Sequence, residues 1–320
     1  FPTGGGKTEA YLGCIAFSIL HRRIVDPADG GVSALMRYTL RILTTDQFAR
    51  AAGLVCALEV IRRRHLPKSR VEISLGLWVG DQSVPNRRKN AIEELNRLRS
   101  GNKEERDSNL LQVKRCPHCG SSLSSDDYNI DLESGLRISC PVLRCDFNDG
   151  LPLYIIDDDV YEQRPSLVVG TVDKFAQMAW KSEVAQLLGT DGKFSTPDLI
   201  VQDELHLISG PLGTMVGLYE SSLDLALTDR SKSKVKIIAS TATIRQADDQ
   251  VSSVFDRKSA QFPPAGITPS DNYFSKEASP EEIGDRRYVG LIAPGTSQAT
   301  LIVRLYAALL CIPRYGLGGG

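Results

Sequence analysis

A glycine-rich loop at the start of the chain restricts the possible folds more than any other feature of the sequence. Three consecutive glycines are followed directly by Lys7 and Thr8, the order typical of a phosphate-binding loop between a strand and a helix. Glycines let backbone amides approach phosphate oxygens, the lysine reaches the terminal phosphates, and the threonine hydroxyl binds Mg²⁺. The loop predicts an α/β fold with a helix over residues 8–22, whose N-terminus faces the phosphates. The residues expected to contact a nucleotide are Thr3, Gly4, Gly5, Gly6, Lys7 and Thr8.

A second motif, far downstream, supplies the acidic groups that a phosphate-binding loop needs. An apolar run over residues 198–202 is followed by Asp203, Glu204 and, two residues later, His206. Asp203 is expected to hold Mg²⁺ together with Thr8, and Glu204 to orient or deprotonate the attacking water. His206 is expected to sense the γ-phosphate. Either half alone also fits a flexible loop or a polar turn, but the two in this order predict nucleotide hydrolysis. The predicted catalytic residues are Lys7, Asp203, Glu204 and His206.

The rest of the chain alternates between short apolar runs and helix-like segments. This alternation indicates a mainly parallel sheet, with ligands bound at the carboxyl ends of its strands. Two regions interrupt it: residues 103–165, with paired cysteines and few helix signals, and residues 256–285, with several Pro and Ser. We expect an insertion and an irregular connector there. Strands are predicted at residues 37–45, 71–79, 166–170, 198–202 and 235–239, and further helices at 47–64 and 86–112.

Four of the seven cysteines have the spacing of a metal site. Two residues separate Cys116 from Cys119, and four separate Cys140 from Cys145. Four thiolates from two such turns suit tetrahedral Zn²⁺, and we expect a closed, structural site that holds the insertion together. The alternative is that these thiols are free or merely buried. His118, between the first two cysteines, is expected to stay outside the site.

Composition and charge exclude several other classes of protein. Seven unevenly placed cysteines are too few for a secreted disulfide framework, and paired cysteines favour a reducing cytosol. No apolar run approaches the ~18 residues that span a bilayer, so we expect a cytoplasmic protein without membrane contact. Basic residues outnumber acidic ones between positions 21 and 115, and the reverse holds between 116 and 210. A basic face suits a nucleic-acid backbone, although ordinary solvated helix faces explain the same pattern.

A third motif, Ser240-Thr241-Ala242-Thr243, follows the apolar run at residues 235–239. With the glycine loop and Asp203-Glu204-Leu205-His206 before it, the chain resembles a superfamily 2 helicase of the DExH-box type. The resemblance implies a RecA-like P-loop NTPase domain in which the third motif couples the nucleotide state to the grip on nucleic acid. Two further helicase motifs would fall at residues 44–47 and 170–174, with strand-to-helix turns as the alternative reading. The residues implied in coupling are Ser240, Thr241, Ala242 and Thr243, and those implied in nucleic-acid contacts are Thr44, Thr45, Gln47, Thr171 and Lys174.

Longer stretches of the chain narrow the resemblance. Residues 1–11, 43–47 and 170–175, together with the cysteine insertion, look like the helicase component of the bacterial DISARM anti-phage system. That resemblance implies DNA as the polymer, ATP as the fuel and a protein partner in a defence complex. The domains expected are a first RecA-like ATP-binding domain at residues 1–102 and 166–255, a zinc-binding insertion at 103–165, a connector at 256–285 and the start of a following segment at 286–320.

Two features lead us to expect that the 320 residues are part of a longer protein. A P-loop normally follows a buried strand, but only Phe1 precedes Pro2. Nothing after Thr243 resembles a second domain with the arginines that complete such an ATPase. We expect the isolated chain to bind ATP–Mg²⁺ weakly and to hydrolyse it poorly.

Three functions are open at this point. The leading one is an ATP-dependent DNA helicase or translocase in bacterial phage defence. The second is a P-loop ATPase that acts as a switch or assembly motor without strand separation. The third is a zinc-stabilised nucleic-acid-binding module with a vestigial ATP site. DNA-stimulated hydrolysis separates the first from the third, and strand displacement separates the first from the second.

Overall fold

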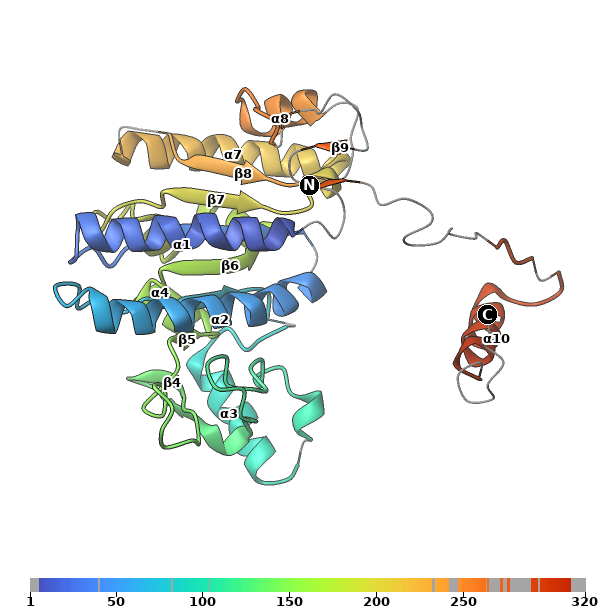
Figure 1. Ribbon diagram of the computed structural model, residues 1–320, viewed down its shortest axis with the longest axis horizontal. Helices are drawn as coiled ribbons and strands as arrows, with labels where there is room; N and C mark the ends of the chain where they lie inside the picture. Colours follow the sequence, from blue (N-terminus) through green and yellow to red (C-terminus); the bar gives the residue numbers. More distant parts are fainter. Residues whose placement is uncertain are drawn as a thin grey trace. The chain divides into compact units, whose positions relative to one another are not determined.

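The computed structural model of the chain divides into two compact units, residues 1–264 and residues 265–320 (Figure 1). Its described residues are 6–39, 41–81, 83–102, 104–231, 234–241, 247–262, 264, 271–272, 275–276, 289–292 and 294–311. Across this described part of the chain, none of the helices has both the length and the apolar content of a membrane span.

A parallel sheet forms the centre of the first unit. Over the described residues its strands are β1 Ala34–Tyr38, β2 Leu75–Trp78, β5 Leu153–Tyr154, β6 Leu167–Thr171, β7 Leu199–Gln202 and β8 Lys236–Ala239. Their order is β5-β2-β6-β1-β7-β8, and every pairing is parallel. The predicted α/β class with a mainly parallel sheet is therefore confirmed. In the middle of the sheet, Arg37 of β1 is in register with Gly170 of β6 and Gln202 of β7.

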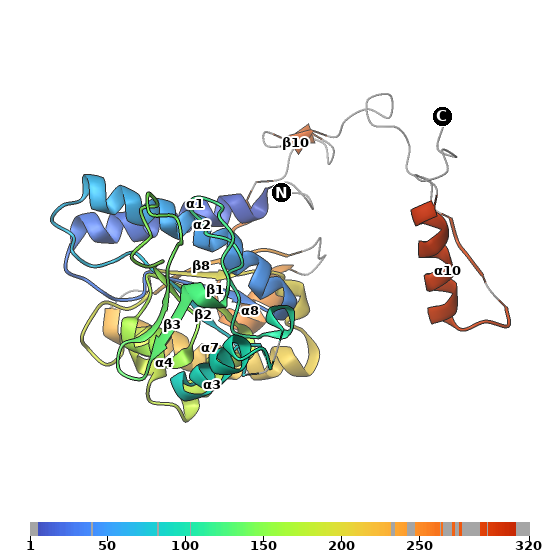
Figure 2. The same cartoon turned by 90° about the horizontal axis from the view of Figure 1, so that it is seen from below.

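Helices cover both faces of this sheet. One face carries α1 (Lys7–Val25) and α2 (Arg41–His65), and the other carries α4 (Asp157–Gln163) and α7 (Gly210–Ser231) (Figure 2). The short helix α5 (Val172–Phe175) packs in the same core cluster as α7. Side chains of β1 alternate between the layers: Met36 joins a core cluster with α1 and α2, and Leu35 joins one with α5 and α7. Burial on both faces explains why the central strands β6 and β7 are nearly continuous apolar runs in the sequence.

Shorter helices connect the main elements of the first unit. They are α6 Val184–Leu188, α8 Ala247–Phe255, η1 Glu105–Asp107, η2 Ser125–Asp127, η3 Ala176–Ala179 and η4 Leu205–Leu207. The strands of the sheet end at the side where α1 and α2 begin (Figure 1). Ligands of parallel sheets bind at this edge, so the fold itself singles out one side of the molecule.

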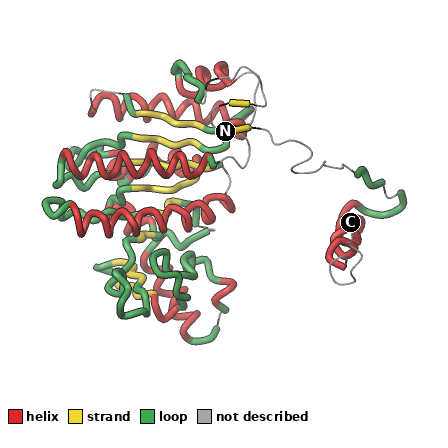
Figure 3. Tube along the Cα trace, in the orientation of Figure 1, coloured by secondary structure: helices red, strands yellow, loops and turns green. Residues whose placement is uncertain are grey.

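Between α3 (Arg88–Arg99) and α4, most of the chain is loop and turn (Figure 3). It includes an antiparallel hairpin of β3 (Tyr128–Asp131) and β4 (Gly135–Ile138). The buried Tyr128 and Phe147 belong to the same core cluster as the sheet face under α1 and α2. β5 also falls inside the expected insertion, yet it pairs with β2 as an edge strand of the main sheet. The insertion thus extends the main core, and its boundaries stay a prediction.

The described part of the second unit is small. It contains a short antiparallel pair, β9 (Asp271–Asn272) and β10 (Ser275–Lys276), and the helix α10 (Gln298–Cys311). α10 is apolar, and Val303 and Leu310 are exposed on it. The limits expected for the connector and the following segment stay predictions.

Two elements end at other residues than the sequence predicts. β1 ends at Tyr38 and α2 begins at Arg41, whereas we expect a strand to residue 45 and a helix only from residue 47. Short apolar runs of this kind fit a strand and a helix equally well. α3 ends at Arg99 rather than near residue 112, because Gly101 is left-handed (φ 72°) and its amide bonds to the carbonyl of Leu98, a common helix stop.

Candidate functional site

The first turn of α1 presents residues expected to bind phosphate. Gly6 caps the helix in the left-handed conformation (φ 77°, ψ 24°), which a residue with a side chain adopts only with strain. Lys7 and Thr8 follow in the first helical turn, and both are half-buried. The free amides of this turn and the helix dipole favour an anion here. Thr3, Gly4 and Gly5 lie outside the described residues.

The acidic motif lies where β7 ends, at the same edge of the sheet (Figure 1). The amide of Asp203 donates to the carbonyl of Arg37 at 3.1 Å, so the central strand β1 sets the position of this residue. Glu204 has a left-handed backbone (φ 50°), a strained conformation that is typical of functional turns. Its carboxylate lies 3.2 Å from Nδ1 of His206. The side chains of Glu204 and His206 are therefore paired, and the Asp203 carboxylate accepts the amide of Glu204 at 3.0 Å.

Ser240, in the loop after β8, contacts the acidic motif directly. Its hydroxyl donates to Oδ1 of Asp203, and its carbonyl accepts the amide of Leu205 at 2.8 Å. The predicted coupling segment thus touches the predicted Mg²⁺ ligand. Thr241 is half-buried, and its hydroxyl has no hydrogen-bond partner within the described residues. Ala242 and Thr243 lie outside those residues.

Buried tyrosines place α1 beside the acidic motif. The pKa of Tyr11, on α1, is raised to about 12, mainly by burial and in part by the charges of Asp203 and Glu204, while Ser240 opposes the shift. Burial and the charge of Asp203 also raise the pKa of Tyr38 at the end of β1. These charges act on the tyrosines only at short range. The phosphate-binding helix and the acidic motif, far apart in sequence, therefore meet at one edge of the sheet.

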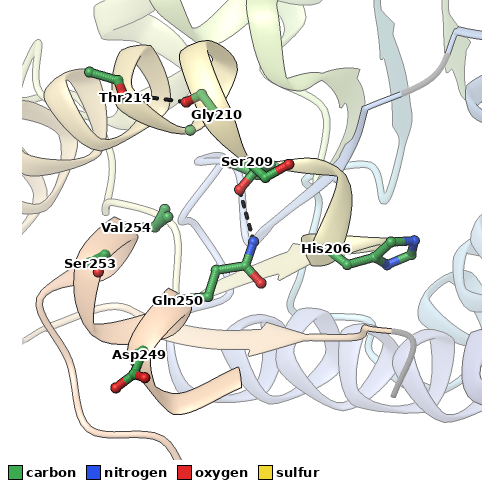
Figure 4. A pocket seen from close by; sticks show the side chains of 10 residues that line it. His206, Ser209, Gly210, Thr214, Asp249, Gln250, Ser253 and Val254 are labelled. Atoms are coloured by element: carbon green, nitrogen blue, oxygen red, sulfur yellow. Dashed lines mark hydrogen bonds between the residues drawn. The ribbon is translucent and has the colours of Figure 1, made fainter. Parts of the chain in front are cut away.

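One residue that sequence reasoning missed, Gln250 of α8, supports the acidic turn. Its Nε2 donates to the carbonyls of Leu205 and Ile208, at 2.9 and 2.8 Å. Figure 4 shows this side chain reaching from α8 toward the turn before α7, while His206 points away from it. A cavity of about 520 Å³ surrounds these groups, lined by the turn, α7 and α8. A single glutamine on a helix belongs to no motif, so only the tertiary structure reveals its contacts.

The residues expected to contact nucleic acid differ in their accessibility. Thr44 and Thr45 lie in the first turns of α2, and their side chains are not described. Gln47 is half-buried. Thr171 is fully buried at the end of β6, and Lys174 is 1% exposed. In this conformation Thr171 and Lys174 are not open to a polymer, because both side chains lie inside the protein.

Lys174 forms an ion pair with Asp157 inside the protein. The two side chains are 1% and 2% exposed, and Lys181 lies 3.5 Å from the same carboxylate. Burial lowers the pKa of Lys174 and raises the pKa of Asp157, and their mutual attraction opposes both changes. The ring of Trp78 lies 5.9 Å from the ammonium. The pair connects α5 to α4.

Replacing Lys174 by Met is expected to lower the free energy of unfolding by about 3 kcal/mol, because a buried carboxylate loses its main partner. Replacing Lys181 by Met is the control, with an expected cost below about 1 kcal/mol, since Lys181 is the more distant and more exposed partner. Urea unfolding measures both. A Lys174→Met protein as stable as the wild type, but with weaker DNA binding, would contradict the interior role.

The four predicted metal ligands form one sulfur cluster. All four Sγ atoms lie within 4.8 Å of one another. The pair Cys116 and Cys145 is 3.8 Å apart, and the pair Cys119 and Cys140 is 3.5 Å apart. Thiolates bound to Zn²⁺ at ~2.3 Å in a tetrahedron are ~3.8 Å apart, so these residues are placed to hold a metal ion. Three of the four are buried, which suits a structural site without an open position.

Ser121 lies beside two of the four cysteines. The hydroxyl of Ser121 lies 3.2 Å from Sγ of Cys119 and 3.3 Å from Sγ of Cys140. Hydrogen bonds from the hydroxyl and the backbone of Ser121 help to lower the pKa of Cys119 to about 6. Burial raises the pKa of Cys116 and of Cys145 instead. His118 lies 3.5 Å from Asp146 instead and is not part of the cluster.

The sulfur cluster packs against the second half of α2. Burial raises the pKa of Cys56, on α2, to about 12, and Cys116 and Cys145 are close enough to add to this effect. The guanidinium of Arg63 lies 5.0 Å from the ring centroid of Phe147 in the second cysteine turn. The insertion is thus attached to the helix whose first turns carry Thr44 and Thr45.

Comparison with known proteins supports the resemblance found in the sequence. No family model matches the chain. The chain is 37% identical, over an alignment of 358 residues covering 97% of it, to the DISARM protein DrmA of Bacillus paralicheniformis. It spans 32% of the length of that relative. The similarity to a DISARM component predicted from the motifs is confirmed.

Two solved structures are similar at a lower level. The DUF1998 helicase MrfA bound to DNA gives a TM-score of 0.43 at 14% identity, covering 80% of this chain and 23% of that one. Mss116p bound to ssRNA and AMP-PNP gives a TM-score of 0.27 at 10% identity, covering 76% and 41%. The α/β fold is shown by the parallel sheet itself.

Proposed function

We propose that this chain is the ATP-binding part of a superfamily 2 DNA helicase or translocase that acts in the cytoplasm in bacterial phage defence. The observation that carries the proposal is that α1 begins at the edge of the parallel sheet where Asp203 and Ser240 are hydrogen-bonded, with Tyr11 of α1 near Asp203 (Figure 1). Similarity to the DISARM protein DrmA supports the role in defence. Because the chain spans about a third of that relative, the activity of the whole protein is part of the proposal.

The first turn of α1 would bind the nucleotide. Lys7 would hold the terminal phosphates, and the backbone amides of residues 3–8 would hold the phosphate oxygens. Thr8 and Asp203 would hold Mg²⁺, which neutralises charge on the phosphates when it is bound. The hydroxyl and carboxylate oxygens of these two residues are the ligands that Mg²⁺ prefers.

The acidic turn would perform the hydrolysis. Glu204 would take a proton from the attacking water, a role that needs a carboxylate beside the Mg²⁺ ligand. An N–H at Nδ1 of His206, 3.2 Å away, would orient that carboxylate. Ser240, which donates to Asp203, is placed to respond when the nucleotide changes. Thr241, Ala242 and Thr243 would carry that response onward.

DNA contacts are proposed for the start of α2. Thr44, Thr45 and Gln47 follow directly after β1, at the edge of the sheet where the strands end. Basic residues predominate in the surrounding segment from 21 to 115, which favours a polyanion. Thr171 and Lys174 would contribute through the packing of α5 instead, since both are buried.

The four cysteines are proposed to bind Zn²⁺ as a structural site. The distances between their sulfurs fit tetrahedral coordination. The cysteine turns rest on α2 through Cys56 and Arg63. Zinc would therefore stabilise the insertion and, through it, the helix proposed to contact DNA.

A second candidate, an ATPase switch without strand separation, is favoured by one observation. Two of the five residues expected to contact nucleic acid, Thr171 and Lys174, are buried. A partner protein rather than a polymer would then stimulate the same ATP site. The third function, a module with a vestigial ATP site, predicts no hydrolysis at all.

DNA is expected to raise the ATP hydrolysis rate of the full-length natural protein by about tenfold, a coupling of ordinary size. RNA of the same sequence is the matched control for the polymer. A rate of ATP hydrolysis that neither DNA nor RNA changes would contradict the helicase proposal. A strand-displacement assay then distinguishes a helicase from a switch, because only the helicase separates a duplex.

A further inference from the structure

We infer that Arg37 and Glu220 are positioning residues, which hold the Mg²⁺-binding carboxylate of Asp203 in place. Arg37 is the fourth residue of β1, and Glu220 lies on α7. Neither belongs to a sequence motif discussed above. The inference rests on the proposed function, because it assigns a role within the same ATP site.

Arg37 and Glu220 form a buried ion pair. Their side chains are 0% and 4% exposed. Nη1 of Arg37 donates to Oε1 of Glu220, and Nη2 donates to Oε2 at 3.4 Å. The guanidinium also lies 5.2 Å from the ring centroid of Phe175, the last residue of α5. A two-pronged contact between planar groups fixes orientation as well as distance.

The backbone of Arg37 acts on the acidic motif. Its carbonyl accepts the amide of Asp203 at 3.1 Å and Nε2 of Gln202 at 3.4 Å. The turn after Asp203 leads directly into α7, which carries Glu220. Arg37 therefore contacts the start of the acidic turn through its carbonyl and the middle of the following long helix, α7, through its guanidinium.

Stability alone does not account for a charged pair at this place. The neighbouring side chains of the layer, such as Leu35, Ile200 and Leu223, are apolar. A buried ion pair loses the hydration of both charges, and apolar residues of similar volume often stabilise a core equally well. Contacts between apolar residues have no preferred direction, so they do not fix the orientation of one element relative to another. The pair therefore suits a role in which α7 has to be held at a fixed position relative to β1.

The test replaces both charges at once, Arg37→Met with Glu220→Leu, in the full-length natural protein. No buried charge is left without a partner, so we expect a folded protein with an unchanged melting temperature. We expect the Mg²⁺ concentration for half-maximal ATP hydrolysis to rise about tenfold, and kcat to fall with little change in KM for ATP. The conservative variant Arg37→Lys is expected to lose less, because Lys keeps one contact to the carboxylate.

The matched control is Arg164→Met with Asp191→Leu. Arg164 also pairs with a carboxylate and lies 5.2 Å from a phenylalanine ring centroid, that of Phe194. It precedes β6, at the opposite edge of the sheet. We expect the control protein to keep the wild-type Mg²⁺ dependence.

Three results would overturn the inference. They are a wild-type Mg²⁺ dependence in the Arg37→Met, Glu220→Leu protein, an equal shift in the control, and an unfolded doubly substituted protein with Arg37→Lys unaffected. In the last case the ion pair would be needed for folding and not for the position of Asp203. Absence of Mg²⁺-dependent hydrolysis in the wild-type protein is a different failure, since it contradicts the proposed function before any variant is compared.

Discussion

Replacing Glu204 by Gln in the full-length natural protein is expected to slow ATP hydrolysis by about 10²- to 10⁴-fold while ATP binding is retained. Glutamine keeps the size of the side chain but cannot accept a proton from the attacking water. Replacing Lys7 by Ala is expected to abolish binding and hydrolysis together, because the cation at the terminal phosphates is lost. Steady-state hydrolysis and equilibrium binding of an ATP analogue measure the two effects separately.

The matched control for this prediction is Glu133→Gln. Glu133 is an exposed glutamate in the turn between β3 and β4, so its replacement is expected to leave both measurements unchanged. Hydrolysis at the wild-type rate in the Glu204→Gln protein would show that the acidic turn is not the catalytic centre. Loss of ATP binding in that variant would instead assign Glu204 to the nucleotide-binding groups.

Replacing Cys116 by Ser is expected to remove the bound zinc and to lower the free energy of unfolding by about 5 kcal/mol or more, since binding of a structural metal contributes directly to folding. Cys116 is 1% exposed and part of the main core cluster, so the loss extends beyond the insertion. Metal analysis of the purified protein and thermal unfolding are the measurements. The expected stoichiometry is one zinc ion per chain in the wild type and none in the variant.

The control for the metal site is Cys14→Ser. Cys14 is exposed on α1, away from the sulfur cluster, and its replacement is expected to change neither metal content nor stability beyond about 0.5 kcal/mol. A wild-type protein purified without metal, and as stable after chelation as before, would contradict the zinc proposal. The cysteines would then be ordinary buried thiols.

Local chemistry made much of this protein predictable. The strand at residues 198–202 was recognisable because it is a short apolar run followed by two acidic residues, and β7 is found there. The end of β1 was not predictable, since the run from Arg37 to residue 45 fits a strand and a helix alike. From Phe48 onward, α2 packs on the sheet, a contact between distant segments that the local run does not encode.

Some residues of the candidate site are likewise predictable from the sequence, and others are revealed only by the structure. Asp203 and Ser240 were candidates because each follows an apolar strand in a known motif, and the structure joins them by a hydrogen bond. Lys174 was chosen from the same kind of pattern, but its ammonium pairs with a buried carboxylate. Gln250 gave no sequence signal, although it holds two carbonyls of the acidic turn. Burial and long-range hydrogen bonds depend on residues that are far apart in the sequence, so no short spacing of residue types predicts them.

By itself, the sequence determined the α/β class, the four grouped cysteines and the resemblance to a DISARM component. These are readable because phosphate and metal binding need particular side chains at short, regular spacings. Only the tertiary structure decided which of the chosen side chains face a ligand and which, like Lys174, lie in the interior. The same holds for Arg37, whose partners are Asp203, directly after the end of β7, and Glu220 on α7. Such contacts depend on how distant elements pack, and packing follows from the whole chain rather than from any segment of it.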